Sequence, residues 1–494
     1  MKIGFDNAMY MEKQKQHILE RIESFRGKLY LEFGGKLFDD YHAARVLPGF
    51  DVNAKIKLLH DLRDKAEIIF VVSAGDIEKT KIRADLGISY DMDVLRLIDD
   101  ITHMGIDVNS VVITQYTGQS AADAFAAKLT MRGVKNYIHH PIKGYPSDID
   151  YICSEQGFGS NAYVGVTAPG PGSGKLATCL SQVYHETVRG IPAGYAKFET
   201  FPIWNLPLKH PVNLAYEAAT ADLADLNMID PFHLEAYGKT TVNYNRDVEA
   251  FPIVHTILSR IAGETDCPYK SPTDMGVNMA GYAIVDDAAV SEASRQEIVR
   301  RYYKTVCDHR QGKGSQEAIE KIRLIMQQLN LKPNDRAVVE PALTKSSTSG
   351  MPAGAIQLPD GRIFTGKASD LMSASSATVL NAIKALSGIA DDLTLISPVI
   401  LEPIIKLKIN ILNSRSTLLK LDDVLTALAM SAATNPVAAR AMEALVLLRD
   451  CEMHSTQMLH SGDEGTLRRL GECLRRLALR LTCEPVFPGK DLFF

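Results

Sequence analysis

The chain has 494 residues, 46% hydrophobic and 23% charged, with a formal net charge of −5. This length predicts two or three domains with buried cores, and the acidic balance argues against a protein built to hold nucleic acid. The amino-terminal residues lack the apolar core of a signal peptide, and no apolar run reaches the length of a membrane span. The seven scattered cysteines include no CxxC pair, so neither a zinc site nor a disulfide framework is indicated. We therefore expect a cytoplasmic protein that binds neither nucleic acid nor membrane.

The first 150 residues alternate short apolar runs with stretches of helical spacing. Such alternation with short connections predicts a parallel sheet covered by helices on both faces, here a Rossmann-like α/β unit. The predicted strands are 28–35, 67–74, 108–116 and 134–142, and the predicted helices are 54–65, 93–105 and 120–133.

A second α/β series spans residues 151–332. It begins with a strand, a glycine-rich turn and a helix, which is the order of a P-loop-like unit. It continues with a strand at 194–203, a helix at 213–226, a helix at 246–263 that Pro252 should break, and helices at 292–312 and 314–330.

Residues 333–494 predict a smaller, mainly helical α+β domain. A hairpin is expected in IQLPDGRIF, with Asp360-Gly361 at its turn. The hydroxyl-rich stretches 344–354 and 365–369 read as loops that could close over an anionic ligand, or equally as mobile surface loops. Amphipathic helices near the carboxyl end favour self-association, so we expect a homo-oligomer.

The residues TAPGPGSGKLATC (167–179) are similar to a phosphate-binding loop. Glycines let successive backbone N–H groups surround an anion, the following helix adds its positive dipole, and a lysine reaches the terminal phosphates. We predict that a phosphate or nucleotide is held by Gly170, Gly172, Ser173, Gly174, Lys175 and Thr178.

Two positions depart from the standard motif. Pro169 stands where its first glycine should be, and Leu176 stands where the hydroxyl that holds magnesium should be. Thr178 is one position too far round the helix for that role. The sequence therefore supports phosphate binding and leaves open whether a nucleotide is used with Mg²⁺. The alternative is a glycine-rich turn without a ligand.

Four residues are candidates for catalysis. A phosphotransferase needs a carboxylate at the end of another strand, and Asp230 is the first candidate, with Glu199 the second. His210 and His233 could bind or polarise the substrate. The alternative for Asp230 is a turn that ends a strand, since Asp before Pro favours turns.

Polar segments follow several predicted strands. In a doubly wound sheet, ligands bind beyond the C-terminal strand ends, and long polar loops are costly unless they bind something. The adjacent His139 and His140 do not predict a metal site, because metal ligands usually come from more than one segment. The candidate substrate-binding residues are Lys36, His42, Arg45, His140, Lys143, Lys209, Asn213, Arg246, Lys270 and Asp274.

Nearly the whole chain resembles the DUF1846, or UPF0371, family of uncharacterised bacterial proteins. The stretches that carry the resemblance include EFGGKLFDDYHAARVLPGF, HHPIKGYPSDID, TAPGPGSGK, MIDPFHLEAYG and YKSPTDMGVNM. The resemblance implies a cytoplasmic bacterial protein with an α/β amino-terminal part and a smaller carboxy-terminal domain, and it implies little about chemistry. In the family the stretch between SNAY and VTAPG is several residues longer. The glycine loop is also similar to that of adenylate-kinase-like P-loop enzymes, apart from Pro169 and the residues after Lys175.

These features together predict an enzyme that binds a nucleotide or another small phosphorylated ligand at residues 170–175, as a phosphoryl- or other group transferase. One alternative is a nucleotide-sensing or scaffold protein without turnover, which Leu176 favours. Another is a transferase or hydrolase that acts on a phosphorylated metabolite without ATP.

Overall fold

The structure is a computed structural model, and it divides into two compact units. The sheet unit comprises 3–216 and 225–290, and the C-terminal unit comprises 1–2, 217–224 and 291–494. The finer division at residues 150 and 332 stays a prediction. The described residues are 2–25, 28–83, 87–141, 165–169, 172–223, 225–263, 267–414, 416–449, 451–472 and 480–486.

A parallel sheet of seven strands forms the centre of the sheet unit, in the order β11-β8-β1-β7-β2-β5-β6. Strands from both sides of residue 150 share this sheet, and β7 lies between β1 and β2. Because all strands are parallel, their carboxyl ends meet at one edge, where the glycine turn after β7 lies. The strands are β1 (Lys28–Phe33), β2 (Ile68–Ser73), β5 (Val108–Thr114), β6 (Lys135–Ile138), β7 (Gly165–Thr167), β8 (Ala193–Phe198) and β11 (Gly276–Val277).

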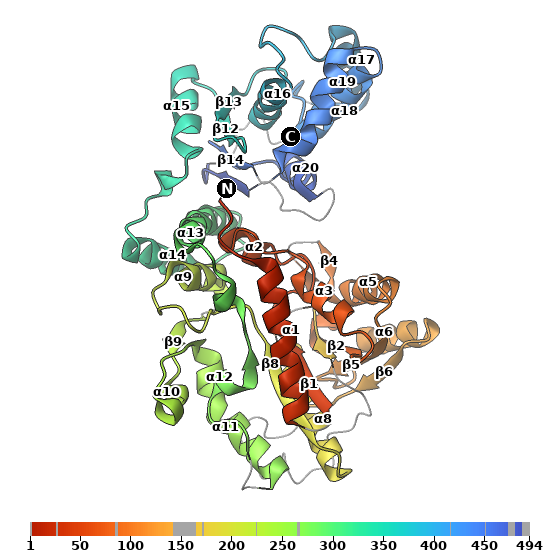
Figure 1. The fold of residues 1–494 in the computed structure, drawn as a ribbon. Helices are drawn as coiled ribbons and strands as arrows, with labels where there is room; N and C mark the ends of the chain where they lie inside the picture. Colours follow the sequence, from red (N-terminus) through yellow and green to blue (C-terminus); the bar gives the residue numbers. More distant parts are fainter. Residues whose placement is uncertain are drawn as a thin grey trace. The chain divides into compact units, whose positions relative to one another are not determined.

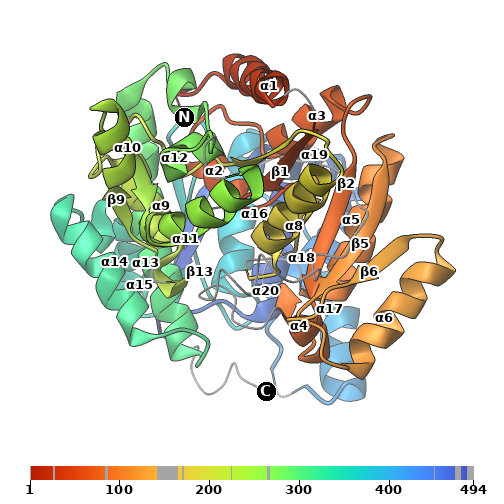
Figure 2. The same cartoon turned by 90° about the horizontal axis from the view of Figure 1, so that it is seen from below.

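Helices cover both faces of this sheet (Figures 1 and 2). Alternate residues of a strand point to opposite faces, so Leu31 and Phe33 join one buried cluster, whereas Tyr30 joins the other. The first cluster includes α1 (Asn7–Ser24), α3 (Ala54–Asp61), α5 (Tyr90–His103) and α6 (Ser120–Met131), and the second includes α8 (Lys175–Val188) and α11 (Asn245–Ala262). The predicted α/β class with helices on both faces is confirmed.

Shorter elements connect the strands of the sheet unit. The antiparallel strands β9 (Asn227–Ile229) and β10 (Val242–Tyr244) form a separate pair. The short helices are α2 (Tyr41–Val46), α4 (Ala74–Glu78), α9 (Pro211–Ala219), α10 (Pro231–Tyr237) and α12 (Pro272–Met275), and a two-stranded pair is formed by β3 (Ile82–Arg83) and β4 (Ile88–Ser89).

The C-terminal unit packs helices against a four-stranded sheet of order β13-β12-β14-β15. Antiparallel pairing of β12 with β13 confirms the expected hairpin, and Gly361 at its turn has a φ of 87°. The strands are β12 (Ala353–Gln357), β13 (Ile363–Lys367), β14 (Glu452–Ser455) and β15 (Arg480–Cys483). The helices are α13 (Asp287–Arg310), which begins in the sheet unit, α14 (Gln316–Gln328), α15 (Val339–Ser349), α16 (Ala374–Leu386), α17 (Pro398–Lys406), α18 (Leu421–Ala432), α19 (Pro436–Glu443) and α20 (Ser461–Glu472).

Three local predictions are wrong. A loop is predicted over the stretch 365–369, whereas β13 extends through it to Lys367 and pairs with β12. The sequence predicts a break at Pro252, whereas α11 is continuous, because it buries Phe251 and Val254 in the core, and this burial outweighs the cost of a proline inside a helix. The composition predicts a loop over 344–354, whereas α15 extends to Ser349. Its hydroxyls are satisfied inside the helix: that of Ser349 donates to the Lys345 carbonyl at 2.7 Å.

Candidate functional site

The glycine turn lies at the carboxyl edge of the sheet. Gly172 and Gly174 have φ values of 75° and 92°, in the left-handed region that favours glycine, and α8 begins at Lys175 directly after them. Thr114, the last residue of β5, fixes the turn, since its hydroxyl donates to the Ser173 carbonyl at 2.6 Å. The turn therefore presents the positive end of a 14-residue helix together with a lysine, a favourable arrangement for an anion.

The turn does not fit the magnesium site of a standard phosphate loop. Leu176 packs against the buried cluster around α8 and carries no oxygen. The hydroxyl of the buried Thr178 donates to the Gly174 carbonyl at 3.0 Å, so it is used within the helix. Of the other predicted residues, Gly170 and Lys143 lie outside the described residues.

A buried group of polar side chains, here the Lys197 cluster, lies on the α8 face of the sheet. It consists of Lys197, Glu199, Tyr244 and Asp247. The Lys197 ammonium lies 2.8 Å from Glu199 Oε1 and also contacts the Asp247 carboxylate and the Tyr244 hydroxyl. That hydroxyl donates to Glu199 Oε1 at 3.0 Å. One cation is thus shared by two carboxylates in a largely buried place.

The Lys197 cluster and the glycine turn share one face and one edge of the sheet. Lys197 is the register partner of Glu32 on β1. Cys179, one turn along α8 from Lys175, has a pKa held well above its usual range by burial and by Glu32, against the opposing effect of Lys175. The Cys179 thiol therefore lies within electrostatic range of both Glu32 and Lys175.

The carboxyl group of Glu199 titrates near neutral pH. Burial raises its pKa to about 7, an effect that Lys197 opposes and Asp247 reinforces. The Lys197 pKa lies well above its usual range: burial favours the neutral amine, but the Asp247 and Glu199 carboxylates outweigh it. A carboxyl group with a pKa near 7 suits general acid–base chemistry.

Sequence reasoning singled out Glu199 and missed its three partners in the Lys197 cluster. A signal was available in the strand GYAKFE, because central parallel strands are normally apolar throughout. Tyr195, Lys197 and Glu199 alternate there and so point to one face.

The raised pKa of Glu199 predicts a measurable dependence of stability on pH. The folded protein binds this proton more tightly than the unfolded chain, whose pKa is near 4.5, so the stabilisation is complete below pH 4.5 and is lost as the pH rises to about 7. We expect the Glu199→Gln variant to lack this loss. Its unfolding free energy relative to the natural protein should rise by about 1–3 kcal/mol between pH 4.5 and pH 8. Urea unfolding at both pH values would measure this. If the unfolding free energy changes with pH by the same amount in the variant and in the natural protein, the prediction is contradicted.

An aromatic chain connects His42 to the Lys197 cluster. The His42 ring lies 5.1 Å from that of Phe201 and 6.2 Å from that of Tyr216, which lies 6.4 Å from the Tyr244 ring. Arg246 lies over the Tyr244 ring at 5.8 Å. The structure therefore brings His42, Arg246 and Glu199, all predicted as site residues, around one group of rings.

The loop after β1 is organised by a lysine that sequence reasoning did not select. The buried Lys55 ammonium lies 3.0 Å from Asp40 Oδ2 and donates to the Gly34 carbonyl at 3.1 Å. Burial favours the neutral acid, yet the Lys55 charge keeps the pKa of Asp40 below its usual value. The predicted Lys36 is exposed, and Arg45 lies over the Tyr41 ring at 5.9 Å.

Asp230 and His233 lie in a different group of contacts, between α10 and α12. Asp230 Oδ1 accepts the His233 amide at 3.0 Å, and its Oδ2 accepts the Thr273 hydroxyl at 2.6 Å and the Thr273 amide at 3.3 Å. The carboxylate is fully buried and caps α10. His233 Nδ1 lies 3.0 Å from Ser271 Oγ, and the predicted Asp274 accepts the Tyr237 hydroxyl at 2.9 Å.

The remaining predicted residues serve local structure or lie exposed. His210 Nε2 lies 3.0 Å from Asp287 Oδ1, and burial lowers the pKa of His210 despite that carboxylate. The Asn213 amide group binds both the N–H and the carbonyl of Ile203. Lys209, Lys270 and His140 are exposed, with His140 Nδ1 3.0 Å from the Tyr116 carbonyl oxygen.

Within the residues that the structure describes, no group of three or more His, Cys, Asp or Glu side chains is placed to hold a metal ion. None of the described helices combines the length and the apolar character needed to cross a membrane.

Comparison with known proteins gives consistent matches over the full length. Residues 3–330 match the N-terminal domain of unknown function DUF1846, and residues 334–493 match its C-terminal domain. UPF0371 proteins are 56% identical in Clostridium botulinum (strain Alaska E43 / Type E3), 54% in Clostridium tetani and 53% in Clostridioides difficile, covering all of both chains. These alignments span 509 positions, so these relatives carry residues that the 494-residue chain lacks. The chain belongs to the DUF1846, or UPF0371, family.

Proposed function

We propose that this protein is an enzyme that holds the phosphoryl group of a small phosphorylated ligand at the glycine turn and acts on the ligand with the Lys197 cluster. The observation that carries this proposal is the placement of both features on one face and one edge of the parallel sheet. In open α/β sheets this edge is where ligands bind.

The two features have complementary chemistry. The turn offers the α8 N-terminus and Lys175, which neutralise phosphate oxygens. Glu199 exchanges a proton near neutral pH and can act as general base or acid, while Lys197 stabilises negative charge that develops beside it. Group transfer or hydrolysis on a phosphorylated metabolite needs a group that binds phosphate, a group that exchanges a proton and a cation that stabilises negative charge. It does not need a metal ion held by the glycine turn.

A nucleotide is a second candidate ligand, and a protein that binds it without turnover is the second candidate function. Leu176 supports the latter, since the hydroxyl that would hold the magnesium of ATP is replaced by an apolar side chain. Self-association into a homo-oligomer and a cytoplasmic location stay predictions.

The Lys175→Ala variant tests the proposal. We expect inorganic phosphate, sugar phosphates or nucleotides to raise the Tm of the natural protein, and we expect Lys175→Ala to abolish that rise, because it removes the cation at the turn. A thermal-shift screen with and without Mg²⁺ measures it.

The matched control is Lys128→Ala, which removes an exposed lysine from α6 of the same unit. Its Tm should rise with these ligands as much as that of the natural protein. The same is expected of Glu199→Gln, which leaves the turn intact. An unchanged response of Lys175→Ala to every ligand that stabilises the natural protein would exclude a role for that lysine.

A further inference from the structure

Two cysteines of the C-terminal unit lie in contact although 176 positions separate them in the sequence. Cys307 lies near the end of α13, and Cys483 is the last residue of β15. Their sulfur atoms are 3.4 Å apart, and the Cys307 sulfur also lies 3.5 Å from the Cys483 carbonyl oxygen. A disulfide bond is about 2.05 Å long, so the two sulfurs need to approach by roughly 1.4 Å to form one. Small rotations of the two side chains supply a movement of this size.

Contacts of neighbouring residues hold α13 against β15 at this place. One turn of α13 before the first thiol, Tyr303 donates its hydroxyl to Glu484 Oε1 at 3.3 Å. The Tyr303 ring lies 5.1 Å from the ring of His454, whose Nδ1 lies 2.9 Å from Thr482 Oγ1. These contacts reach the residues on both sides of the second thiol. The position of one sulfur relative to the other is therefore fixed by side chains other than the thiols themselves.

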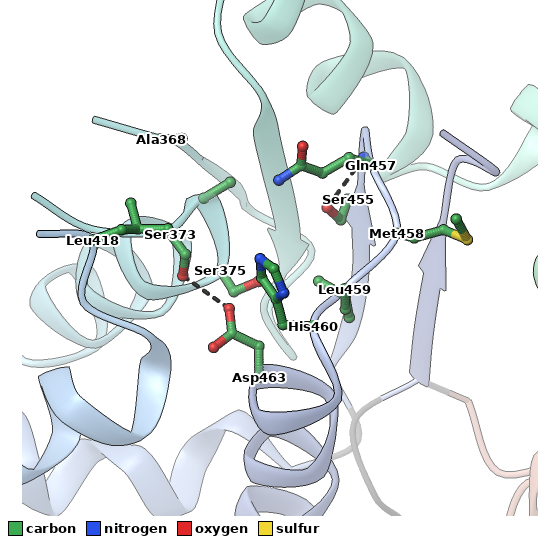
Figure 3. Close-up of a pocket in the computed structure, with 11 residues that line it drawn as sticks. Ala368, Ser373, Ser375, Leu418, Ser455, Gln457, Met458, Leu459, His460 and Asp463 are labelled. Carbon is green, nitrogen blue, oxygen red and sulfur yellow. Dashed lines mark hydrogen bonds between the residues drawn. The ribbon is translucent and has the colours of Figure 1, made fainter. Parts of the chain in front are cut away.

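The second thiol is also within reach of a small molecule. Cys307 is buried, whereas Cys483 is half-buried and is the register partner of Ser455 on β14. Ser455 and Leu459 line a hollow that is partly open to solvent (Figure 3). A backbone hydrogen bond from Leu459 acts on the Cys483 thiol. The Cys483 sulfur therefore adjoins the wall of this hollow.

The hydrogen bond between the two thiols affects their reactivity. It raises the pKa of the Cys483 thiol, burial raises it further, and the hydrogen bond from Leu459 opposes both effects. Cys483 is therefore protonated at neutral pH. Because the thiolate is the reactive form of cysteine, the reduced pair is stable until an oxidant is present in excess.

We propose that Cys307 and Cys483 form a reversible disulfide when a small peroxide oxidises the half-buried Cys483. In the first step the Cys483 sulfur takes one oxygen from hydrogen peroxide, the O–O bond breaks, and one water leaves. In the second step the Cys307 sulfur attacks the Cys483 sulfenic acid, the S–S bond forms, the S–O bond breaks, and a second water leaves. Two thiols are oxidised to one disulfide, and one peroxide is reduced to two waters. The new bond fixes β15 to α13.

Peptide mapping of the full-length chain tests this proposal. The reduced protein is treated with an excess of hydrogen peroxide at pH 8, and the thiols that remain free are then alkylated under denaturing conditions. After trypsin digestion, mass spectrometry should find peptide 305–310 linked to peptide 481–490, and a small dithiol should separate them. Folding holds the two sulfurs together, so the link should form at least about tenfold faster in the native protein than in the urea-unfolded chain.

The Cys307→Ser variant should lack the linked peptides, because Cys483 then has no thiol beside it. The matched control is Cys267→Ser, which removes a half-buried thiol whose sulfur lies 3.8 Å from the Tyr269 carbonyl oxygen in the sheet unit. It should form the link as fast as the natural protein. Peptides that stay unlinked in the oxidised native protein would overturn the proposal, and so would linking within twofold of the rate in urea. This comparison uses the natural protein, so it decides the question even if Cys307→Ser does not fold.

Discussion

Replacing Lys197 with Met is expected to lower the free energy of unfolding of the sheet unit by about 3–5 kcal/mol, the usual cost of leaving a buried charge without its partner. Methionine keeps most of the volume of the lysine stem, so the loss reports on charge and not on a cavity. Glu199 and Asp247 would lose the cation that they share. They would take up protons in response, so the loss should be greater at pH 8 than at pH 6.

The single tryptophan makes this measurement specific to the sheet unit. Trp204 packs against Gly276, where an added Cβ would lie 2.4 Å from its ring, and its carbonyl accepts the Val242 amide at 3.1 Å. Urea unfolding followed by Trp204 fluorescence therefore reports on this unit. Lys128→Met on the exposed side of α6 should change the unfolding free energy little. A loss below about 1 kcal/mol for Lys197→Met would show that the cluster is not electrostatically coupled as described.

The double variant Lys197→Met/Glu199→Gln separates charge from packing. Removing one of the two carboxylates should recover part of the stability lost on removing the cation, because less uncompensated charge stays buried. If the double variant is less stable than Lys197→Met by the full cost of Glu199→Gln alone, the two side chains do not interact.

The architecture of the sheet unit was largely predictable from the sequence, because its strands are short apolar runs separated by helices of clear spacing. Strand order was not. Nothing in the sequence of β7 indicates that this strand inserts between β1 and β2, because the order of strands in a sheet depends on long-range packing. The α11 helix shows the same limit, because tertiary burial of Phe251 outweighed the local effect of Pro252.

The site was predictable only where one segment carries the signal. Gly172, Gly174 and Lys175 stand together in the sequence, so the turn could be identified. The Lys197 cluster joins β8 with residues 45 to 50 positions further along the chain, and spacing alone cannot show such a convergence. Asp230 illustrates the converse. A carboxylate at the end of a predicted strand suited catalysis, and its position before a proline favoured a turn, but its oxygens accept three hydrogen bonds, one from His233 in the same helix and two from Thr273.

Replacing Asp230 with Ala should lower the unfolding free energy of the sheet unit by about 2–4 kcal/mol, measured by Trp204 fluorescence in urea. The change removes the N-cap of α10, worth about 1 kcal/mol, and leaves the buried Thr273 hydroxyl and amide without an acceptor. Asp230→Asn should lose less unfolding free energy, because its amide oxygen still accepts one of these bonds and Asn is a good N-cap.

The Asn variant also distinguishes a structural carboxylate from a ligand-binding one. If Asp230 only positions α10 and α12, this variant keeps the phosphate-dependent rise in Tm. If Asp230 orients a ligand, that rise disappears while stability is nearly unchanged, because a ligand-directed carboxylate contributes to binding and not to the fold.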